Sequence, residues 1–294
     1  MSGIGVLYPG ELGVALGRAI VQAGGTAITC LSGRSKATQC RAAAANFVVV
    51  PSLKEVARQS ELVISLVPPA SAVETARSFA ACFDFARCGS GPTAGLTFID
   101  ANSVSPLTKR RIAEILSHGG IRCLDGAFFG PAKGIGRDNV LALSGPRAGQ
   151  IPPLLQEVVE VHVVGETIGQ ASALKMVLAI MTKALPALFL EMVCASASGG
   201  QLDPALELMR RLYPGIMGFL ERTLPTYPAH VARRVQELEE VADWLHQLNQ
   251  CGTMTQSAIT VLERLRLAGL ESRADWTFED LLHRIADADL LPAF

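Results

Sequence analysis

Lys175 is the residue of this sequence whose type and surroundings best suit proton transfer. It stands among small and apolar residues, Gly169 to Met176, near the start of a long predicted helix. A lysine on a mostly apolar helix either extends its ammonium to water or faces a pocket, and burial in a pocket would lower its pKa and suit it to acid–base work. Thr182 stands two helical turns further on, almost directly above Lys175. We interpret Lys175 as the candidate catalytic acid or base and Thr182 as a candidate substrate contact.

The beginning of the chain has the plan of a dinucleotide-binding unit: residues 4–23 run from a short apolar stretch through a glycine turn into a helix. Gly10 would let the backbone approach a pyrophosphate, and Gly13 would let the helix pack closely on the strand. The glycine fingerprint is incomplete because Tyr8 stands in place of its first glycine, so an ordinary strand–turn–helix is the alternative. With the free N–H groups of the first helical turn, the predicted cofactor-binding residues are Gly10, Glu11, Leu12 and Gly13.

The loop after the second predicted strand bears on which nicotinamide cofactor fits. An acidic residue there would accept the ribose hydroxyls of NAD, but residues 32–36 read Ser-Gly-Arg-Ser-Lys. Arg34 is suited to stack on adenine and pair with a 2′-phosphate, with Ser32 and Ser35 as further donors. We therefore expect NADP ahead of NAD, with a solvated basic turn as the alternative.

Three further loops follow predicted strands and supply the other candidate residues. Ligands of open parallel sheets lie at the carboxyl ends of the strands, where this sequence places Val67-Pro68 and then Asn102-Ser103. Pro68 would form a wall near the nicotinamide, and Asn102 and Ser103 would bond cofactor or substrate. After the next strand, residues 125–131 read as a small-residue loop, in which we expect Phe129 and Gly130 to line the substrate site.

Short apolar runs alternate with helical stretches up to about residue 165, which predicts a buried, mostly parallel sheet with helices on both faces. After Gly165 no β-branched runs follow, and we expect one long helix over 166–199 that Pro186 would kink. Asp203-Pro204 fits the N-cap and first position of the next helix. We thus divide the chain into an α/β domain, 1–165, and an all-helical domain, 166–294. Predicted strands are 4–7, 26–31, 47–50, 62–67, 97–100, 121–125, 141–143 and 161–164, and later helices are 204–212, 214–222, 228–249, 254–269 and 277–287.

Composition narrows the classes of function. The chain has 294 residues, 49% of them hydrophobic, and a net charge of −1, so we expect no binding of nucleic acid or of anionic membranes. Its apolar runs are short and interrupted, so we expect no membrane span. The seven cysteines are widely spaced and include no C-x-x-C pair. We expect reduced thiols in a cytoplasmic protein and no metal site.

In the order of its motifs the sequence resembles the β-hydroxyacid dehydrogenases, the group that includes 3-hydroxyisobutyrate and 6-phosphogluconate dehydrogenases. The resemblance covers roughly residues 4–190 and consists of four blocks: 5–13, Val63–Pro68, Ile99–Pro106 and Lys175. It implies a Rossmann-type domain followed by an all-α domain, with Lys175 as general acid/base. It also implies that the loop holding Ser103 meets nicotinamide and substrate, and that the protein is a homodimer. The second half is similar to a divergent branch of phosphogluconate dehydrogenase-like proteins of unassigned substrate.

Two departures from this family bear on the substrate. Phe129-Gly130-Pro131 replaces the serine–glycine–glycine that binds a carboxylate in the family, and Leu178 and Ala179 stand where an asparagine usually follows the lysine. An apolar pocket fits a bulkier or less anionic substrate. The leading hypothesis is an NADP-dependent oxidoreductase acting on a carbonyl or alcohol carbon. The alternatives are an NADPH-dependent imine reductase and a non-catalytic NADP-binding protein.

Overall fold

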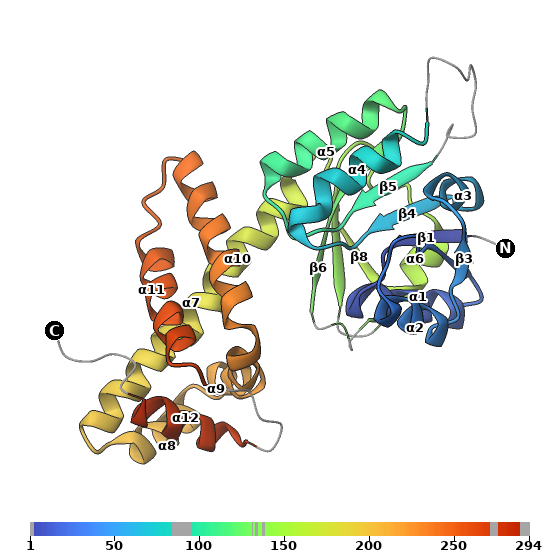
Figure 1. Ribbon diagram of the computed structural model, residues 1–294. Coiled ribbons are helices and arrows are strands. Elements are labelled where there is room, and N and C mark those ends of the chain that lie inside the picture. Colours follow the sequence, from blue (N-terminus) through green and yellow to red (C-terminus); the bar gives the residue numbers. More distant parts are fainter. Residues whose placement is uncertain are drawn as a thin grey trace. The chain divides into compact units, whose positions relative to one another are not determined.

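The computed structural model describes residues 3–83, 96–130, 132, 135–136, 139–270 and 276–288. Its internal contacts divide the chain into two compact units, Met1–Lys175 and Met176–Phe294 (Figure 1). The division lies inside helix α7 (Gln170–Ser198) rather than ahead of it at Gly165. Lys175 is therefore packed with the first unit, on the opening turns of the helix.

The first unit is built on an eight-stranded sheet in the order β3-β2-β1-β4-β5-β6-β7-β8. Strands β1 to β6 are parallel, β7 is antiparallel to β6, and β8 is parallel to β7. This confirms the mostly parallel α/β sheet. The strands are β1 Gly3–Leu7, β2 Thr26–Cys30, β3 Val48–Val50, β4 Leu62–Ser65, β5 Thr97–Asp100, β6 Arg122–Phe129, β7 Val140–Ser144 and β8 Glu160–Gly165.

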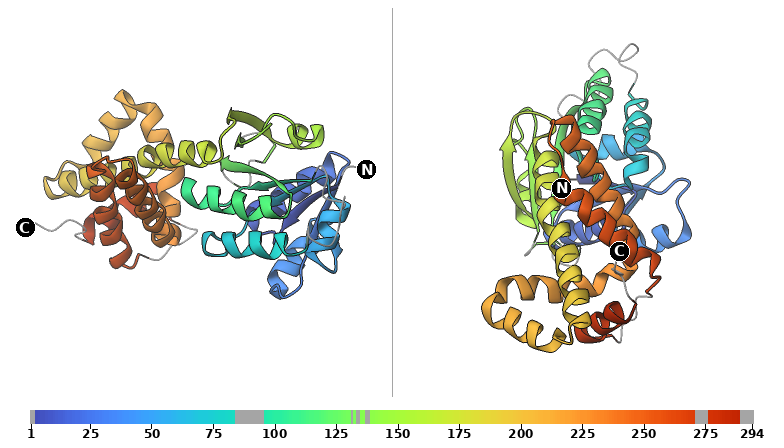
Figure 2. Two further views of the ribbon diagram at one scale, coloured as in Figure 1. Left: turned by 90° about the horizontal axis from the view of Figure 1, so that it is seen from above. Right: turned by 90° about the vertical axis from the view of Figure 1, so that its left-hand side faces the viewer.

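Helices cover both faces of this sheet (Figures 1 and 2), because every central strand is apolar on both sides. One apolar core joins the sheet to α1, α2 and α6, and another joins its opposite face to α3, α4 and α5. Burial on both faces explains why the strands read as continuous apolar runs in the sequence. The helices are α1 Glu11–Gln22, α2 Lys36–Ala44, α3 Leu53–Gln59, α4 Ala72–Ala80, α5 Pro106–His118 and α6 Pro153–Val158, with a 3₁₀ turn, η1, at Pro69–Ser71.

Serine hydroxyls start three of these helices. Ser35, Ser52 and Ser105 each accept a hydrogen bond from the backbone N–H three residues on, which satisfies one of the open donors of a helix N-terminus. At Ser52 only half of a capping box is formed, because the Glu55 carboxylate bonds Arg58 and Gln59 instead of the Ser52 N–H. Helix α1 differs from these three: Gly10 is its N-cap and gives no side-chain hydrogen bond.

The strand order reverses between β1 and β4, which are hydrogen-bonded neighbours. Open α/β sheets bind ligands beside the carboxyl ends of their strands at such a reversal. Three loops lie there side by side, since β1, β4 and β5 are adjacent and run in the same direction. They are the loop from Tyr8 to Gly10, the loop from Leu66 to Pro68 and the loop from Ala101 to Ser105.

The second unit consists of helices, as the sequence predicted. Helices α10 and α11 pack along each other (Figure 2) and join across a short link in which Gly252 has a φ of 57°. The core includes Phe189 and Leu190 of α7, Leu238 of α10 and Leu262 of α11. The helices after α7 are α8 Leu202–Leu212, α9 Pro214–Thr223, α10 Tyr227–Gln247, α11 Thr253–Leu267 and α12 Phe278–Asp287, with a 3₁₀ turn, η3, at Leu224–Thr226.

The N-cap predicted for α8 is wrong by two residues. Gln201 is the cap, the helix begins at Leu202, and Asp203 lies in the first turn, where a carboxylate still interacts favourably with the helix dipole. Pro204 is tolerated there because the first-turn N–H groups have no partner within the helix.

Helix α7 runs unbroken through Pro186 to Ser198. By length and composition it is also the one described helix that is apolar enough to cross a membrane. Of the apolar 18-residue stretch on which this rests, 33% is buried in the structure. The interrupted runs of the sequence did not predict such a helix. Its inward side chains Phe189, Leu190 and Val193 belong to the core of the second unit.

Candidate active site

The turn after β1 has the geometry that phosphate binding requires. A Cβ added to Gly10 would meet nothing within 4 Å among the described residues, whereas one on Gly13 would lie 3.2 Å from Pro9 Cβ and 3.3 Å from Val6 Cγ1. Gly10 thus leaves space above the turn, and Gly13 brings α1 against the strand. The first-turn N–H groups, without a side-chain cap, point at that space with the positive end of the helix dipole. A pyrophosphate fits these residues.

Tyr8 occupies the first glycine position of the fingerprint and keeps the backbone conformation of a glycine. Its φ is 51°, in the left-handed region that non-glycine residues rarely adopt. The Arg34 guanidinium lies over the Tyr8 ring, 4.1 Å from its centroid, and this cation–π contact offsets part of the strain. Burial raises the pKa of the Tyr8 phenol, against the opposing effect of Arg34.

The loop after β2 places Arg34 beside the phosphate turn, with no acidic side chain between Leu31 and Lys36. Its backbone is held by Gln39, whose amide donates to the Arg34 carbonyl at 2.9 Å. The Ser35 hydroxyl caps α2 and pairs with Thr38 at 3.1 Å. Arg34 and Ser32 are exposed. Ser32, Arg34 and Ser35 are the three residues predicted to contact the adenosine part of the cofactor. Arg34 is the cation among them, and the Ser35 hydroxyl is already used as the cap of α2.

Lys175 and Ser103 are brought together by the fold. The Lys175 Nζ donates to Ser103 Oγ at 2.9 Å, and both side chains are half-buried. Ser103 follows the end of β5 and Lys175 lies on the second turn of α7. A lysine ammonium bonded to a serine hydroxyl, at the strand edge that carries the phosphate turn, is a group able to give or take a proton.

The neighbouring Asn102 faces inward. It is 4% exposed; its carbonyl oxygen accepts from the Val67 N–H at 2.6 Å, and its amide donates to Ser65 at 3.1 Å and Asp100 at 2.7 Å. Both amide hydrogens are therefore used inside the protein, and Asn102 links the ends of β4 and β5. Val67 is buried in that link, and Pro68 is exposed ahead of η1.

Sequence reasoning missed a row of polar residues across the sheet. Ser65, Asp100, Asp125 and Ser144 are register partners on four neighbouring strands, and each is at most 1% exposed. We call these four residues the polar row. Each ends or interrupts an otherwise apolar strand, which is the signal that was available in the sequence.

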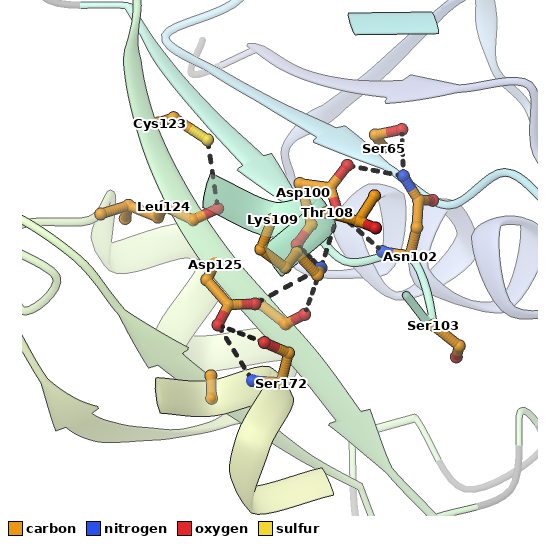
Figure 3. Close-up of polar contacts among 12 residues, drawn as sticks. Ser65, Asp100, Asn102, Ser103, Thr108, Lys109, Cys123, Leu124, Asp125 and Ser172 are labelled. Carbon is orange, nitrogen blue, oxygen red and sulfur yellow. Dashed lines mark hydrogen bonds and ion pairs between the residues drawn. The ribbon is translucent and has the colours of Figure 1, made fainter. Parts of the chain in front are cut away.

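Lys109 of α5 enters the middle of the polar row (Figure 3). Its Nζ lies 2.6 Å from Asp100 Oδ1 and 3.4 Å from Asp125 Oδ1, and it also donates to the carbonyls of Asp100 at 2.5 Å and Gly126 at 3.1 Å. The side chain is 1% exposed. Desolvation alone would lower the pKa of Lys109, but the two carboxylates outweigh it and raise that pKa. Burial raises the pKa of the adjacent Cys123 thiol, because it disfavours the charged thiolate.

The other oxygen of Asp125 holds the start of α7. Oδ2 accepts from the N–H groups of Gly169 at 3.1 Å and Ser172 at 2.9 Å, and from the Ser172 hydroxyl at 3.0 Å. Ser144 accepts from the Ala171 N–H at 3.0 Å. A carboxylate at a helix N-terminus stabilises the helix through these bonds and through the dipole.

The substrate loop predicted after Asp125 is instead strand. Strand β6 continues to Phe129 because antiparallel β7 pairs with it from Asp125 onward. Phe129 is half-buried and packs with Leu174 against a small cluster of alanines. Gly130 is exposed with a φ of 99°, and Pro131 lies outside the described residues.

Thr182 and the cysteines complete the predicted set. The Thr182 hydroxyl is exposed and donates to the Leu178 carbonyl one turn back at 3.0 Å. Cys30 and Cys123 are buried, Cys82 and Cys194 are partly buried, Cys40 and Cys251 are exposed, all without disulfides; Cys88 lies outside the described residues. Among the residues that are described, no three His, Cys, Asp or Glu side chains gather as metal ligands would.

Comparison with known proteins finds two family models that match parts of this chain. The family model described as the NAD binding domain of 6-phosphogluconate dehydrogenase matches residues 3–164, and a domain of unknown function (DUF1932) matches residues 197–265. An uncharacterized 28.5 kDa protein of Methanothermus fervidus is 30% identical over 181 residues. That match spans 62% of this chain and 66% of the relative, just under two thirds of its length.

Solved structures share the fold. The 3-hydroxyisobutyrate dehydrogenase of Salmonella typhimurium superposes with a TM-score of 0.75 at 18% identity, covering 97% of this chain and 100% of that one. An imine reductase from Myxococcus stipitatus, in complex with NADP⁺, superposes with a TM-score of 0.61 at 21% identity, covering 96% and 99%. Because the nucleotide-domain match covers more than half of its length, this chain belongs to the family of the NAD binding domain of 6-phosphogluconate dehydrogenase.

Proposed function

We propose that this protein is an NADP-dependent oxidoreductase that transfers a hydride between nicotinamide and a carbonyl or alcohol carbon, with Lys175 as general acid/base. The observation that carries the proposal is the 2.9 Å contact between Lys175 Nζ and Ser103 Oγ. It lies at the carboxyl edge of the sheet, on the loop after β5, and the phosphate-binding turn after β1 lies at the same edge. Family membership supplies the cofactor class.

The residues that would hold the cofactor are those of the turn and the loops beside it. The backbone N–H groups at Glu11, Leu12 and Gly13 would bind the pyrophosphate. The bound nicotinamide supplies the hydride donor or acceptor. The protein supplies alignment, and the half-buried Phe129 and Leu174 of the same unit provide apolar surface that limits the access of water.

Lys175 would hold or move the proton on the substrate oxygen. In the reducing direction the ammonium gives a proton to the developing alkoxide, and in the oxidising direction the neutral amine takes it from the alcohol. Ser103 fixes the position of the amine through its hydroxyl and is available to a substrate oxygen when the amine moves. Positioning of this kind accounts for a large share of the rate in proton-transfer steps.

NADP is preferred over NAD in this proposal because of Arg34. A guanidinium pairs with a phosphate through two parallel hydrogen bonds, and the stack on Tyr8 at 4.1 Å holds it beside the turn. The absence of an acidic side chain from residues 32–36 removes the usual acceptor of the NAD ribose hydroxyls.

The alternative reaction is reduction of a C=N bond. We retain it because the fold is also similar to that of an imine reductase solved in complex with NADP⁺. The two reactions make different demands on Lys175. Carbonyl chemistry needs a proton at oxygen, which the lysine delivers. The nitrogen of an iminium substrate arrives already protonated, so its reduction proceeds without that transfer.

The test is a panel of substrates assayed by oxidation of NADPH and of NADH. Aldehydes, 2- and 3-ketoacids and cyclic imines are offered to the wild-type protein and to Lys175→Ala. The proposal expects turnover of a carbonyl compound with NADPH that the variant loses. Turnover of imines alone, retained by the variant, would support the alternative reaction. Saturable NADPH binding without turnover across the panel would support a non-catalytic cofactor-binding protein.

A further inference from the structure

Two series of hydrogen bonds lead from the polar row toward the Lys175–Ser103 pair, and we call them the first arm and the second arm. The first arm runs from Asp100 to Asn102: the Asn102 amide donates to Asp100 Oδ2 at 2.7 Å, and its backbone N–H lies 3.4 Å from Oδ1. Ser103 is the next residue. Figure 3 shows Asn102 turned toward Asp100 while Ser103 points away from it. The Asp100–Asn102 contact thus holds the backbone that leads into Ser103.

The second arm runs from Asp125 to the start of α7. Asp125 Oδ2 holds the N–H of Ser172 at 2.9 Å and its hydroxyl at 3.0 Å, one helical turn before Lys175. Gly169 makes this approach possible, since a Cβ there would lie 3.3 Å from Pro106 Cβ and the residue has a φ of 106°. The helix start is therefore packed against α5 and tied to the sheet.

Lys109 is the group that joins these arms. Its three ammonium protons have three acceptors, two on Asp100 and one on Gly126, so the Nζ has a single orientation. Its charge also faces Asp125 at 3.4 Å. Without it two buried carboxylates would stand on adjacent strands with no cation between them among the described residues, an arrangement that burial strongly disfavours.

We propose that Lys109 is a positioning residue for the Lys175–Ser103 pair: its buried ammonium fixes the loop that carries Ser103 to the helix that carries Lys175. Lys109 touches neither substrate nor cofactor in this role. The catalytic meaning of the pair rests on the proposed function, whereas the mechanical link from Lys109 to Lys175 does not. The two are tested by separate measurements.

The first variant is Lys109→Met, which keeps the length of the side chain and removes its charge and hydrogen bonds. We expect kcat to fall roughly a hundredfold, as for reacting groups misplaced by about an ångström. The Kd for NADPH stays near its wild-type value, because Lys109 bonds Asp100 and Gly126 rather than the phosphate turn after β1. A general loss of stability would move both of these quantities together.

The second readout is chemical and needs no turnover. The chain has six lysines, and limiting acetic anhydride followed by mass spectrometry reports the acetylation rate of each. In Lys109→Met we expect the rate at Lys175 to rise, because its amine is no longer held at Ser103. The rates at Lys36 and Lys183 stay unchanged and serve as internal references. Leu116→Ala is the matched control: Leu116 is fully buried on the same helix, α5, and its loss lowers stability without touching the polar row.

Charge balance is separated from positioning by Lys109→Met/Asp100→Asn, which restores the original net charge of the buried group. We expect this double variant to regain the unfolding midpoint lost by Lys109→Met while its kcat stays low and Lys175 stays reactive. Recovery of kcat together with stability would overturn the proposal, as would wild-type Lys175 acetylation in Lys109→Met. If neither lysine variant folds, Ser172→Ala decides, because it removes one contact of the second arm and keeps every charge. Unchanged Lys175 acetylation in that variant would overturn the proposal.

The proposed function fails by a different result. If Lys175→Ala keeps its kcat, the pair has no catalytic role, and the acetylation of Lys175 still decides whether Lys109 positions it. If Lys175→Ala is inactive but Lys109→Met has normal kcat and normal Lys175 acetylation, the proposed function stands and the positioning role is refuted.

Discussion

Lys175 donates a hydrogen bond to Ser103, which precedes it by 72 residues in the chain. Replacing Lys175 with alanine removes the proton donor and acceptor without touching the phosphate turn. We expect kcat to fall roughly a hundredfold or more, with little change in the Kd for NADPH. Steady-state kinetics and fluorescence titration measure the two quantities.

Lys183→Ala is the control for this variant. Lys183 lies on the same helix and pairs with Glu237 at 3.0 Å in the second unit. We expect it to retain wild-type kcat. Equal losses in the two variants would mean that α7 tolerates neither substitution, and Lys175 would lose its assigned role.

Arg34 is predicted to select NADP. Arg34→Ala removes a charge-assisted contact of about 1.5–3 kcal/mol, so the Kd for NADPH should rise roughly 10- to 100-fold while the Kd for NADH changes little. Arg41→Ala, on the exposed face of neighbouring α2, is the control and should alter neither constant. A parallel loss of both cofactors in Arg34→Ala would assign Arg34 to the fold rather than to the 2′-phosphate.

Two glycines of α1 and its cap should separate ligand binding from packing. Gly10→Ala places a methyl group in open space, so it should cost no more than about 1 kcal/mol of stability as an N-cap change but weaken cofactor binding clearly. Gly17→Ala places its Cβ 2.2 Å from the Phe47 ring and should destabilise the fold by about 1–3 kcal/mol. Denaturant unfolding and cofactor titration compare the pair; unchanged binding in Gly10→Ala would count against a phosphate at this turn.

The buried ammonium predicts a loss of stability at alkaline pH. The pKa of Lys109 is raised in the folded protein above the value of 10.5 for a free side chain, so the folded state holds this proton more tightly than the unfolded chain. The resulting stabilisation is complete below about pH 10.5 and is lost as the pH rises through the folded value. Urea unfolding from pH 8 to 11.5 should show this loss in the wild type and a smaller one in Lys109→Met/Asp100→Asn. Identical slopes would remove Lys109 as its source.

We also propose that the protein is a homodimer, because α7 exposes apolar side chains beyond the first unit. Exposed apolar surface of this kind is typical of protein interfaces. Leu178→Glu/Met181→Glu should halve the mass measured by light scattering, whereas Leu267→Glu, at the exposed end of α11, should not change it. A wild-type protein with the mass of one chain would refute the proposal. The exposed apolar residues of α7 are Val177, Leu178, Met181 and Leu188.

Much of the fold followed from the sequence because burial on both faces leaves a plain signal. Strand β5 has the predicted bounds, and most other strands and helices differ by a few residues. Strand β6 was predicted too short because its second half depends on pairing with β7, a contact that no local pattern encodes. The same error turned Phe129 from a strand residue into a loop residue.

The sequence predicted those residues of the candidate site that are recognisable singly. It did not predict the residues that come together only through the pairing of strands. Lys175, Ser103 and Gly10 stand out by type and position. The polar row does not, because its members lie on four strands far apart in the sequence and meet only through register. Nothing in the sequence around Asn102 showed that its amide would bond Ser65 and Val67.

The left-handed backbone at Tyr8 makes the stability of this turn depend on Arg34. A residue other than glycine in the left-handed conformation costs about 1–2 kcal/mol of conformational free energy. Tyr8 has a φ of 51°, and the contact of its ring with Arg34 offsets part of that cost. A substitution of Arg34 therefore also removes a contact that supports the left-handed backbone at Tyr8.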